Sequence, residues 1–405
     1  MGLLRVSWRN LWRNRRRTTI TMAAVALNAI ILITTYSLMD GMLRQTVLNA
    51  TELVTGEAQI HSPGYLSDRS IYKTLENPQA ILQTLREQSI PAAPRAYGYG
   101  LLSRGTKSAG ALFWGVDPES EKATFNLPAH LAEGSFLSPN PQKGIVLGKK
   151  LARSLNARLG AEIVLLVQAA DGSLGNELFT VTGILKSVGE GIDRNAAIIH
   201  LEDYRHLFVL PAGVHEIAVN TGGRVSLDKL SAILPRLVPD AEVKTWRQLL
   251  PALSDMLQLS GASMSLFGAI FFAAAGLGVM NTMLMTTYER SHEFGLLKAL
   301  GTSPWRIVRD VAFEAWLMAA VSTVFAVILG VAATLALQEY GLDTSALAGE
   351  TTIAGVVFDP VWRAALSIEA VVAPVVIMWI VCVLAALYPA AMSARLDPVK
   401  SMHRV

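Results

Sequence analysis

Few side chains in this sequence have the types and the spacing that catalysis or metal binding requires. His200, His206 and His215 do not form an HExxH pattern or another common metal-ligand spacing. No GxSxG motif, which would present a nucleophilic serine on a tight turn, occurs in the 405 residues. The single cysteine, Cys382, stands in an apolar run and has no partner for a disulfide within the chain. We therefore expect a chain without catalytic residues, metal sites or bound cofactors of its own.

The segment Tyr288–Gly301, YERSHEFGLLKALG, has the most informative pattern of charged and apolar residues. Its spacing predicts a short helix, in which Lys298 suits the negative C-terminal end. Gly301 stands where a left-handed residue ends a helix, and Ser303 and Pro304 predict the N-cap and first turn of the next one. A rigid helix here would pass the movement of a bound partner to its neighbours. A plain connection between two helices explains the spacing equally well.

Four long apolar stretches predict the helices that this segment joins. Hydrophobic residues make up 52% of the chain and charged residues only 17%, which is unusual for a soluble protein of this length. A helix needs about 20 mostly apolar residues to cross the hydrocarbon core of a bilayer. The stretches that meet this requirement without a charged residue are Ile20–Leu38, Met264–Met285, Ala315–Leu337 and Val371–Tyr388. The sequence thus predicts an α-helical membrane protein with four transmembrane helices.

Lysine and arginine residues indicate on which side of the membrane each connection lies, because short basic connections stay in the cytoplasm. The segment before the first span carries six arginines, from Arg5 to Arg17, and no acidic residue. The connection between spans two and three and the C-terminal tail are basic as well, whereas the connection between spans three and four is acidic. We expect both termini in the cytoplasm and the segment from about residue 40 to residue 259 outside it.

The long segment between the first two spans has the pattern of a mixed α+β domain. Helical spacing at its two ends, the second over Trp246–Leu259, predicts stalks that continue the spans. The elements predicted between the stalks are strands at Ala58–Ser62, Ala111–Val116 and Val214–Asn220, a helix at Pro78–Gln88, a strand and helix within Gly144–Gly160, and a hairpin of Glu162–Val167 and Glu177–Leu185 around Asp171 and Gly172. This domain is therefore inserted between transmembrane helices 1 and 2.

The run ERSHEFGLLKALGTS, with Asn281 before it and Glu314 after it, resembles the coupling segment of the MacB/FtsX/LolC-LolE superfamily of ABC permeases. The tail from Tyr388 to Met402 is similar to the ending of that family, and the order of one span, a large domain and three spans is also the same. The opening of the outer segment, Gly56–Tyr65, is most similar to the lipoprotein-releasing branch. A MacB-type chain would carry its own nucleotide-binding domain, which we do not expect here.

The resemblance implies a non-catalytic permease subunit of an ABC transporter. ATP and Mg²⁺ would be bound by a dimer of a separate ATPase subunit, which pushes on the coupling segment. A second permease, identical or homologous, would complete the transporter, and the outer domain would have porter-like and sabre-like subdomains. The cargo would be a lipoprotein or a similar amphiphile, taken from the outer leaflet of a bacterial inner membrane by mechanotransmission. Membrane lipid would be a further partner, and no nucleic acid is expected.

The resemblance also assigns nine segments with expected boundaries. In chain order they are an amphipathic cytoplasmic helix with Leu4, Trp8, Leu11 and Trp12 on one face (1–17), transmembrane helix 1 with its stalk (18–55), the periplasmic domain (56–240), a second stalk with transmembrane helix 2 (241–288), the cytoplasmic coupling helix (289–310), transmembrane helix 3 (311–338), a short periplasmic loop (339–364), transmembrane helix 4 (365–390) and a cytoplasmic tail (391–405).

Two sets of candidate functional residues follow from this assignment. The ATPase-coupling set consists of Arg290, Glu293, Phe294, Gly295, Leu297, Lys298, Ala299, Leu300 and Gly301. The cargo-binding set, which would line an apolar gap open to lipid, consists of Met39, Met42, Leu43, Val356, Val357 and Phe358. Packing of one stalk against the other explains the second set as well. Glu314 is expected to be a structural contact rather than a proton relay.

Two other functions stay open at this point. The chain could be a MacB-like efflux or mechanotransmission permease that works with periplasmic partners. It could also be an FtsX-like regulator of a periplasmic wall hydrolase, although FtsX-like chains have a much smaller outer domain.

Overall fold

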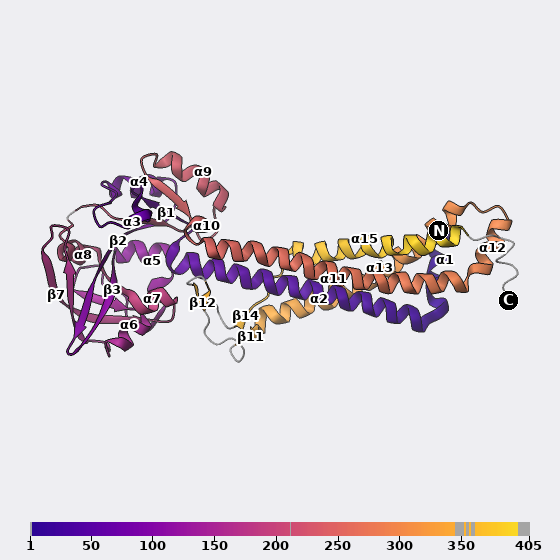
Figure 1. Cartoon of the computed structure of the whole chain (residues 1–405), viewed down its shortest axis with the longest axis horizontal. Helices are drawn as coiled ribbons and strands as arrows, with labels where there is room; N and C mark the ends of the chain where they lie inside the picture. The colour runs from indigo at the N-terminus through magenta and orange to yellow at the C-terminus, as the bar shows by residue number, and fades with distance from the viewer. Residues whose placement is uncertain (1, 211, 345–351, 354–355, 358–360, 396–405) are drawn as a thin grey trace. The chain divides into compact units, whose positions relative to one another are not determined.

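The chain folds as two compact units, each built from segments that are distant in sequence. The computed structural model describes residues 2–210, 212–344, 352–353, 356–357 and 361–395 (Figure 1). The helical unit takes in the described residues within Met1–Arg44, Leu257–Leu347 and Pro360–Val405. The α/β unit takes in those within Gln45–Met256 and Ala348–Asp359. Each unit is considered by itself below.

Four long helices contain the four predicted apolar stretches. They are α2 (Arg15–Ala50), α11 (Pro251–Glu289), α13 (Pro304–Tyr340) and α15 (Ile368–Ala394) (Figure 1). Within the described residues, all four are long and apolar enough to cross a membrane. The prediction of four apolar helices is therefore confirmed. Cys382 lies on α15 as a buried free thiol, inside the apolar run where the sequence has it.

Hydroxyl groups join the apolar helices inside the helical unit. The hydroxyls of Thr21 on α2 and Thr282 on α11 lie 2.6 Å apart and share a hydrogen bond. The indole N–H of Trp379 on α15 donates to Thr323 Oγ1 on α13 at 2.7 Å. Helices in an apolar environment gain little from hydrophobic association with each other, so close packing and such hydrogen bonds fix their register.

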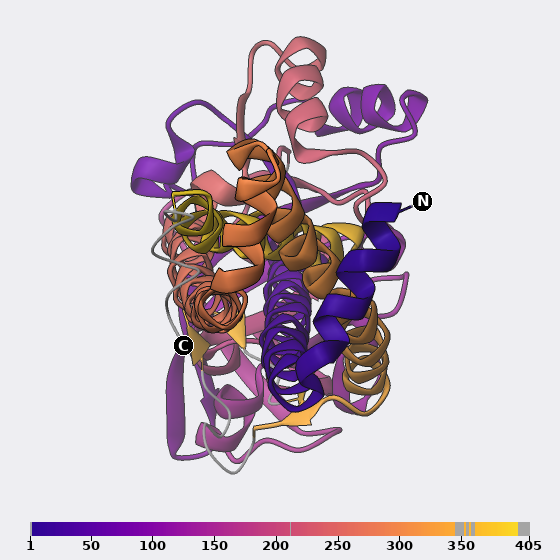
Figure 2. The same ribbon diagram turned by 90° about the vertical axis from the view of Figure 1, so that its right-hand side faces the viewer.

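The N-terminal segment forms two helices instead of the single helix predicted over residues 1–17. α1 (Gly2–Leu11) is followed by a 3₁₀ turn, η1 (Trp12–Asn14), and α2 begins at Arg15. The corner is stabilised by Thr18, whose hydroxyl donates to the carbonyl of Leu11 at 2.7 Å. α1 packs against α13 (Figure 2), with Leu11 buried and Trp8 exposed.

A mixed sheet organises the α/β unit. Among the described residues, ten strands pair in this sheet in the order β10-β1-β9-β2-β3-β8-β5-β7-β4, and β6 pairs with β2 and β7. The strands are β1 (Ala58–His61), β2 (Ala92–Arg104), β3 (Lys107–Val116), β4 (Leu131–Gly134), β5 (Gly144–Leu147), β6 (Glu162–Gln168), β7 (Leu174–Leu185), β8 (Ala196–His200), β9 (Glu216–Val219) and β10 (Glu242–Thr245). Most neighbours are antiparallel, whereas β3 with β8 and β5 with β7 are parallel.

Short helices connect and cover these strands. They are α3 (Tyr65–Asp68), α4 (Pro78–Glu87), α5 (Pro118–Thr124), α6 (Lys149–Ser154), α7 (Glu190–Asn195), α8 (Leu201–Phe208), α9 (Leu227–Leu237) and α10 (Trp246–Leu249), with a π-helical turn η2 (Thr51–Thr55) and a 3₁₀ turn η3 (Leu127–Ala129). The predicted strands, the hairpin of β6 and β7, and the helix α4 are confirmed with small shifts at their ends.

Both helices that border the α/β unit in sequence end at residues with special backbone requirements. η2 ends at Gly56, whose φ of 73° favours glycine and where a Cβ atom would lie 2.6 Å from the carbonyl oxygen of Val219. The continuous helix predicted over Trp246–Leu259 is wrong, because the chain breaks at Leu250 between α10 and α11. Leu250 precedes Pro251, and a residue before proline is disfavoured in helical geometry.

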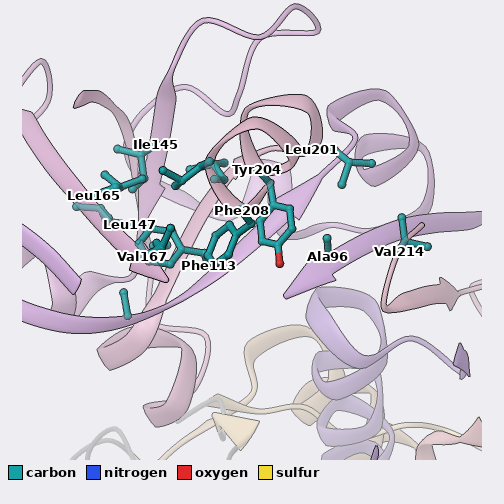
Figure 3. Packing of buried hydrophobic residues seen from close by; sticks show 14 of the residues in the cluster. Ala96, Phe113, Ile145, Leu147, Leu165, Val167, Leu201, Tyr204, Phe208 and Val214 are labelled. Carbon is teal, nitrogen blue, oxygen red and sulfur yellow. The ribbon is translucent and has the colours of Figure 1, made fainter. Parts of the chain in front are cut away.

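The core of the α/β unit centres on aromatic side chains of α8 (Figure 3). The rings of Tyr204 and Phe208 stack with centroids 4.3 Å apart, and Phe208 meets Phe113 of β3 edge to face at 5.8 Å. Two glycines let α8 approach the sheet. A Cβ atom would lie 2.4 Å from the Phe208 ring at Gly98 and 2.5 Å from Tyr204 at Gly115. β2 was missed from sequence because such glycines break the usual strand pattern.

We predict that Phe208→Ala destabilises the α/β unit by about 3–5 kcal/mol, because it removes a fully buried ring from this stack. The measurement is the rate of limited proteolysis between residues 56 and 245, on the full chain in detergent. Leu174→Ala is the control, since Leu174 is 84% exposed. Equal proteolysis of the two variants would contradict the proposed role of the stack.

Candidate functional site

The connection between α11 and α13 contains a separate short helix, α12 (Ser291–Ala299). α11 continues to Glu289, and Arg290 leaves helical geometry with φ −102° and ψ 10°. The prediction of one helix starting at Tyr288 is therefore wrong at its beginning, because Tyr288 belongs to α11. The physical reason lies in Arg290, whose side chain turns at this corner toward two carboxylates.

Arg290 and Glu314 form the central ion pair of the site. Arg290 Nη1 donates to both carboxylate oxygens of Glu314, at 2.9 and 3.0 Å. Asn10 Nδ2 of α1 donates to Glu314 Oε1 at 2.7 Å. The side chains of Arg290 and Glu314 are only 13% and 5% exposed. This structural contact, which the sequence predicted for Glu314, connects α1, the corner before α12 and α13.

A second layer of ion pairs around this centre is more exposed. Arg290 Nε donates to Glu293 Oε2 at 3.3 Å, and Arg13 pairs with the other oxygen of Glu293. Burial of the Glu293 carboxyl opposes its ionisation, but the hydrogen bonds and positive charges of Arg13 and Arg290 outweigh that effect and lower its pKa. Arg17 binds both carboxylate oxygens of Glu289, at 2.8 and 3.0 Å. The Arg13–Glu293 pair attaches η1 to α12, and the Arg17–Glu289 pair attaches the start of α2 to the end of α11.

Apolar packing and a helix-end contact complete the inner side of α12. Phe294 is buried in a cluster with Ile307, Val311 and Ala390, and the Arg290 guanidinium lies 4.9 Å from the centre of its ring. Gly295 is buried beside it. The Lys298 ammonium donates to the carbonyl of Ala394, near the end of α15, at 2.9 Å.

The end of α12 has the geometry that its sequence predicts. Gly301 has φ 87°, and the Thr302 N–H donates to the carbonyl of Leu297 at 3.0 Å, as in a Schellman motif. Ser303 stands at the N-cap position before Pro304, but its side chain makes no cap hydrogen bond. The predicted N-cap position of Ser303 is thus confirmed, but its hydroxyl does not make the expected capping hydrogen bond.

Large apolar side chains are exposed on α12, at its C-cap and in the first turn of α13. We call this set the apolar coupling face: Leu296, Leu297, Leu300 and Trp305, with exposed fractions of 49%, 43%, 76% and 75%. Leu297 and Leu300 belong to the predicted set, and Ala299 is exposed beside them. Leu296 and Trp305 were missed, although a tryptophan directly after the predicted helix start at Pro304 was an available signal.

The nine predicted coupling residues therefore divide between two sides of one short helix. Five of them are buried or make contacts on the inner side: Arg290, Glu293, Phe294, Gly295 and Lys298. The N-terminal partners Asn10, Arg13 and Arg17 were not predicted, because a run of arginines before a span also serves to orient it.

The cargo-binding candidates lie in two different units. Met39, Met42 and Leu43 are partly buried residues of α2 in the helical unit. Val356 and Val357 form β13 (Val356–Val357), which pairs with β12 (Thr352–Ile353) in the α/β unit. Phe358 lies outside the described residues. A shared gap between these groups stays a prediction.

Two of the three histidines considered for metal binding, His200 and His215, make hydrogen bonds to the backbone. His215 Nδ1 accepts from the Tyr97 N–H at 3.0 Å, and its Nε2 lies 3.0 Å from the carbonyl oxygen of Ile71. His200 Nδ1 accepts from the Glu202 N–H at 3.1 Å. Both rings therefore have structural contacts.

Comparisons with known proteins match both units. The family described as FtsX-like permease C-terminal matches residues 265–398, and the MacB-like periplasmic core domain matches residues 18–237, more than half of the chain. LolC, the lipoprotein-releasing system transmembrane protein of Neisseria meningitidis, is 23% identical over 78% of this chain and 76% of its own length. MacB, the macrolide export ATP-binding/permease protein of Marinobacter nauticus, is 22% identical over 84% of this chain and 54% of its own length. The crystal structure of the periplasmic region of MacB from Actinobacillus actinomycetemcomitans covers 50% of this chain with a TM-score of 0.37, at 15% identity and 90% of its own length.

The helical unit has four apolar helices, with the short helix α12 between α11 and α13, and a separate α/β unit accompanies it. This combination is that of a membrane protein of the permease type. The chain belongs to the MacB/FtsX/LolC superfamily of ABC permeases, with its resemblance strongest to the LolC branch.

We predict that Arg290→Met lowers the free energy of unfolding of the helical unit by about 3–5 kcal/mol, because it leaves the buried Glu314 carboxylate unpaired. The double variant Arg290→Met/Glu314→Gln should be less destabilised than the sum of its single changes, since the charge and its partner are removed together. The measurement is a double-mutant cycle of unfolding in mixed detergent micelles. Arg9→Met, at an exposed arginine, is the control. A loss for Arg290→Met no larger than that of the control would show that the pair is not structural.

Proposed function

We propose that this ABC permease couples ATP hydrolysis on a separate subunit to the extraction or release of lipoprotein, or similar amphiphilic cargo, from the outer leaflet of a bacterial inner membrane. The permease has no catalytic role of its own. A dimer of the ATPase subunit binds ATP and Mg²⁺ in the cytoplasm, and its closure moves α12. The movement reaches the α/β unit, which lies in the periplasm, by mechanotransmission.

The observation that carries this proposal is the contrast between the two sides of α12. Large exposed apolar side chains in one place are typical of a protein interface. The apolar coupling face lies at α12 and the turn after it, and the inner side of α12 is attached to η1, α13 and α15 by an ion pair, packing and a hydrogen bond. A partner that binds Leu300 and Trp305 therefore moves several helices and not a loop.

The remaining parts of the proposal follow from charge and family. The arginines around α1 and the basic residues near α12 support a cytoplasmic location of both termini and of α12. A second permease, identical or homologous, pairs with this chain. The α/β unit has porter-like and sabre-like subdomains, and Met39, Met42 and Leu43 on α2 contribute with Val356, Val357 and Phe358 to an apolar gap for acyl chains.

The names of the relatives support the choice of cargo and indicate its alternatives. The LolC relatives are named as parts of a lipoprotein-releasing system, whereas the MacB relative is named for macrolide export. A MacB-like efflux permease with periplasmic partners is therefore the second candidate. An FtsX-like regulator of a wall hydrolase is a third, supported by the match of the C-terminal family model.

Leu300→Glu should reduce the amount of ATPase subunit that co-purifies with the permease by about tenfold, because a contact worth roughly 1.4 kcal/mol is lost. The bound subunit is identified by its Walker A sequence in mass spectrometry and by ATP hydrolysis. Leu174→Glu is the matched control, since Leu174 is 84% exposed, against 76% for Leu300, but lies in the α/β unit. Undiminished ATPase recovery with Leu300→Glu would place the docking surface elsewhere.

Met42→Asp should abolish release of lipoprotein from proteoliposomes while ATP hydrolysis continues, because a charge in the apolar gap excludes acyl chains. Release is measured as transfer of lipoprotein to the soluble fraction after addition of ATP. Met42→Leu keeps the apolar surface and should release cargo normally. Normal release by Met42→Asp would remove this residue from the cargo path.

A further inference from the structure

The α/β unit contains a cavity of about 450 Å³ with aromatic walls. Its size falls within the range of about 300–1,000 Å³ that is common for small-molecule sites. The aromatic side chains that line it are Tyr65, Tyr97, Tyr99, Trp114 and Phe208, contributed by α3, β2, β3 and α8. None of these residues takes part in the apolar coupling face or in the cargo-binding set.

A buried carboxylate forms part of the same wall. Glu216 of β9 lines the cavity and is 4% exposed. Its Oε1 accepts hydrogen bonds from the Tyr97 phenol at 3.0 Å and from Arg95 Nη1 at 3.2 Å. Burial and the neighbouring Glu216 charge raise the pKa of Tyr97 well above its ordinary value, so the phenol keeps its proton and acts as the donor.

Arg95 does not fully compensate this carboxylate, because it pairs more closely with another one. Its Nη2 lies 2.6 Å from Glu121 Oε1, and its Nε lies 3.2 Å from Glu121 Oε2. The buried cluster therefore holds two carboxylates against one guanidinium. A buried charge is costly unless it is paired. Of the two carboxylates, Glu216 is the one that lines the cavity.

Trp114 supplies a second polar group without a partner. Its side chain is 95% buried, and its indole N–H has no hydrogen-bond acceptor among the described residues. An unpaired buried donor costs free energy that a ligand oxygen would recover. The wall thus combines a buried carboxylate that shares its guanidinium with Glu121, an unused donor and several aromatic rings, and Arg69, the exposed cation of the lining, stands in solvent.

We propose that this cavity binds an organic cation, an ammonium group on a short chain that also carries an oxygen acceptor. Aromatic faces attract such cations through the negative charge of their π systems, and Glu216 provides the counter-charge. An anion would be repelled by the buried Glu216, whereas the charge of Arg69, which also lines the cavity, is screened because this side chain is exposed. A purely apolar ligand would leave the Trp114 N–H without an acceptor and the Glu216 charge compensated, among the described residues, only by the shared Arg95. The site goes beyond the proposed transport function and does not depend on it.

The probe is butyrylcholine, compared with 3,3-dimethylbutyl butyrate, in which a carbon atom replaces the charged nitrogen. Both carry the ester oxygen, and their shapes are nearly the same. Binding to the full chain in maltoside detergent is followed by saturation-transfer NMR and by tryptophan fluorescence. We expect the cation to bind at least about tenfold more tightly than its neutral counterpart. Equal affinities, or no binding of either probe at millimolar concentration, would overturn the proposal.

Variants locate the binding in this cavity. Glu216→Gln removes the charge and should weaken butyrylcholine binding about tenfold or more, without affecting the neutral ester. Tyr99→Ala tests the same site without disturbing the core, because Tyr99 is 64% exposed, and should weaken the binding severalfold. Tyr72→Ala is its control, at a tyrosine that is 70% exposed and not among the residues lining the cavity. Binding that is unchanged in Tyr99→Ala would overturn the proposal even if Glu216→Gln fails to fold.

A final comparison separates two sources of such a cation. The titration is repeated in nanodiscs with and without phosphatidylethanolamine. Competition by this lipid would identify an ammonium-bearing headgroup as the occupant. Unchanged butyrylcholine affinity would identify a free solute.

Discussion

The carboxylate of Glu314 is the constraint on which the organisation around α12 depends. It is almost fully buried, so it needs positive and donor groups around it, and it obtains them from Arg290 and Asn10. These partners stand 24 and 304 residues away in sequence. Satisfying one carboxylate therefore fixes α1 and the α11–α12 corner to α13. The break after Glu289 follows from the same requirement, because Arg290 reaches Glu314 from the corner, at the position between α11 and α12.

The buried Arg95 cluster of the α/β unit follows the same physical rule with a different outcome. Around Glu314 the charges are matched by Arg290, with Arg13 and Glu293 extending the network outward. Around Arg95 the acidic groups exceed the basic one. The first arrangement is suited to holding helices together. In the second arrangement Glu216 shares the Arg95 guanidinium with Glu121 and lines a cavity. This difference distinguishes a structural network from a candidate ligand site.

The sequence was sufficient for features that depend on local pattern and insufficient for those that depend on distant partners. Apolar runs predicted α2, α11, α13 and α15, and alternation around Asp171 and Gly172 predicted the β6–β7 hairpin. The end of α12 at Gly301 was also predictable, because glycine is strongly preferred where φ is positive. β2 was not predictable, because its glycines interrupt the strand pattern. They leave space for an aromatic ring of α8, a distant partner in sequence. The contact of Asn10 with Glu314 joins residues 304 positions apart and leaves no periodic pattern in either segment, so neither segment alone predicts it.

The two layers of ion pairs imply an order in which contacts yield when α12 is pushed. Arg13–Glu293 and Arg17–Glu289 are partly exposed, and such pairs contribute about 0–1 kcal/mol each. Breaking a buried pair by loss of one partner costs about 3–5 kcal/mol, which is the situation of Arg290 and Glu314. A force on Leu300 therefore breaks the contacts of α12 with η1 and of α11 with α2 before it breaks the contact of the Arg290 corner with α13. The inner pair keeps this corner attached to α13, while the outer pairs let η1 and the start of α2 change position. α12 and α13 thus move together, and α2 can move relative to them.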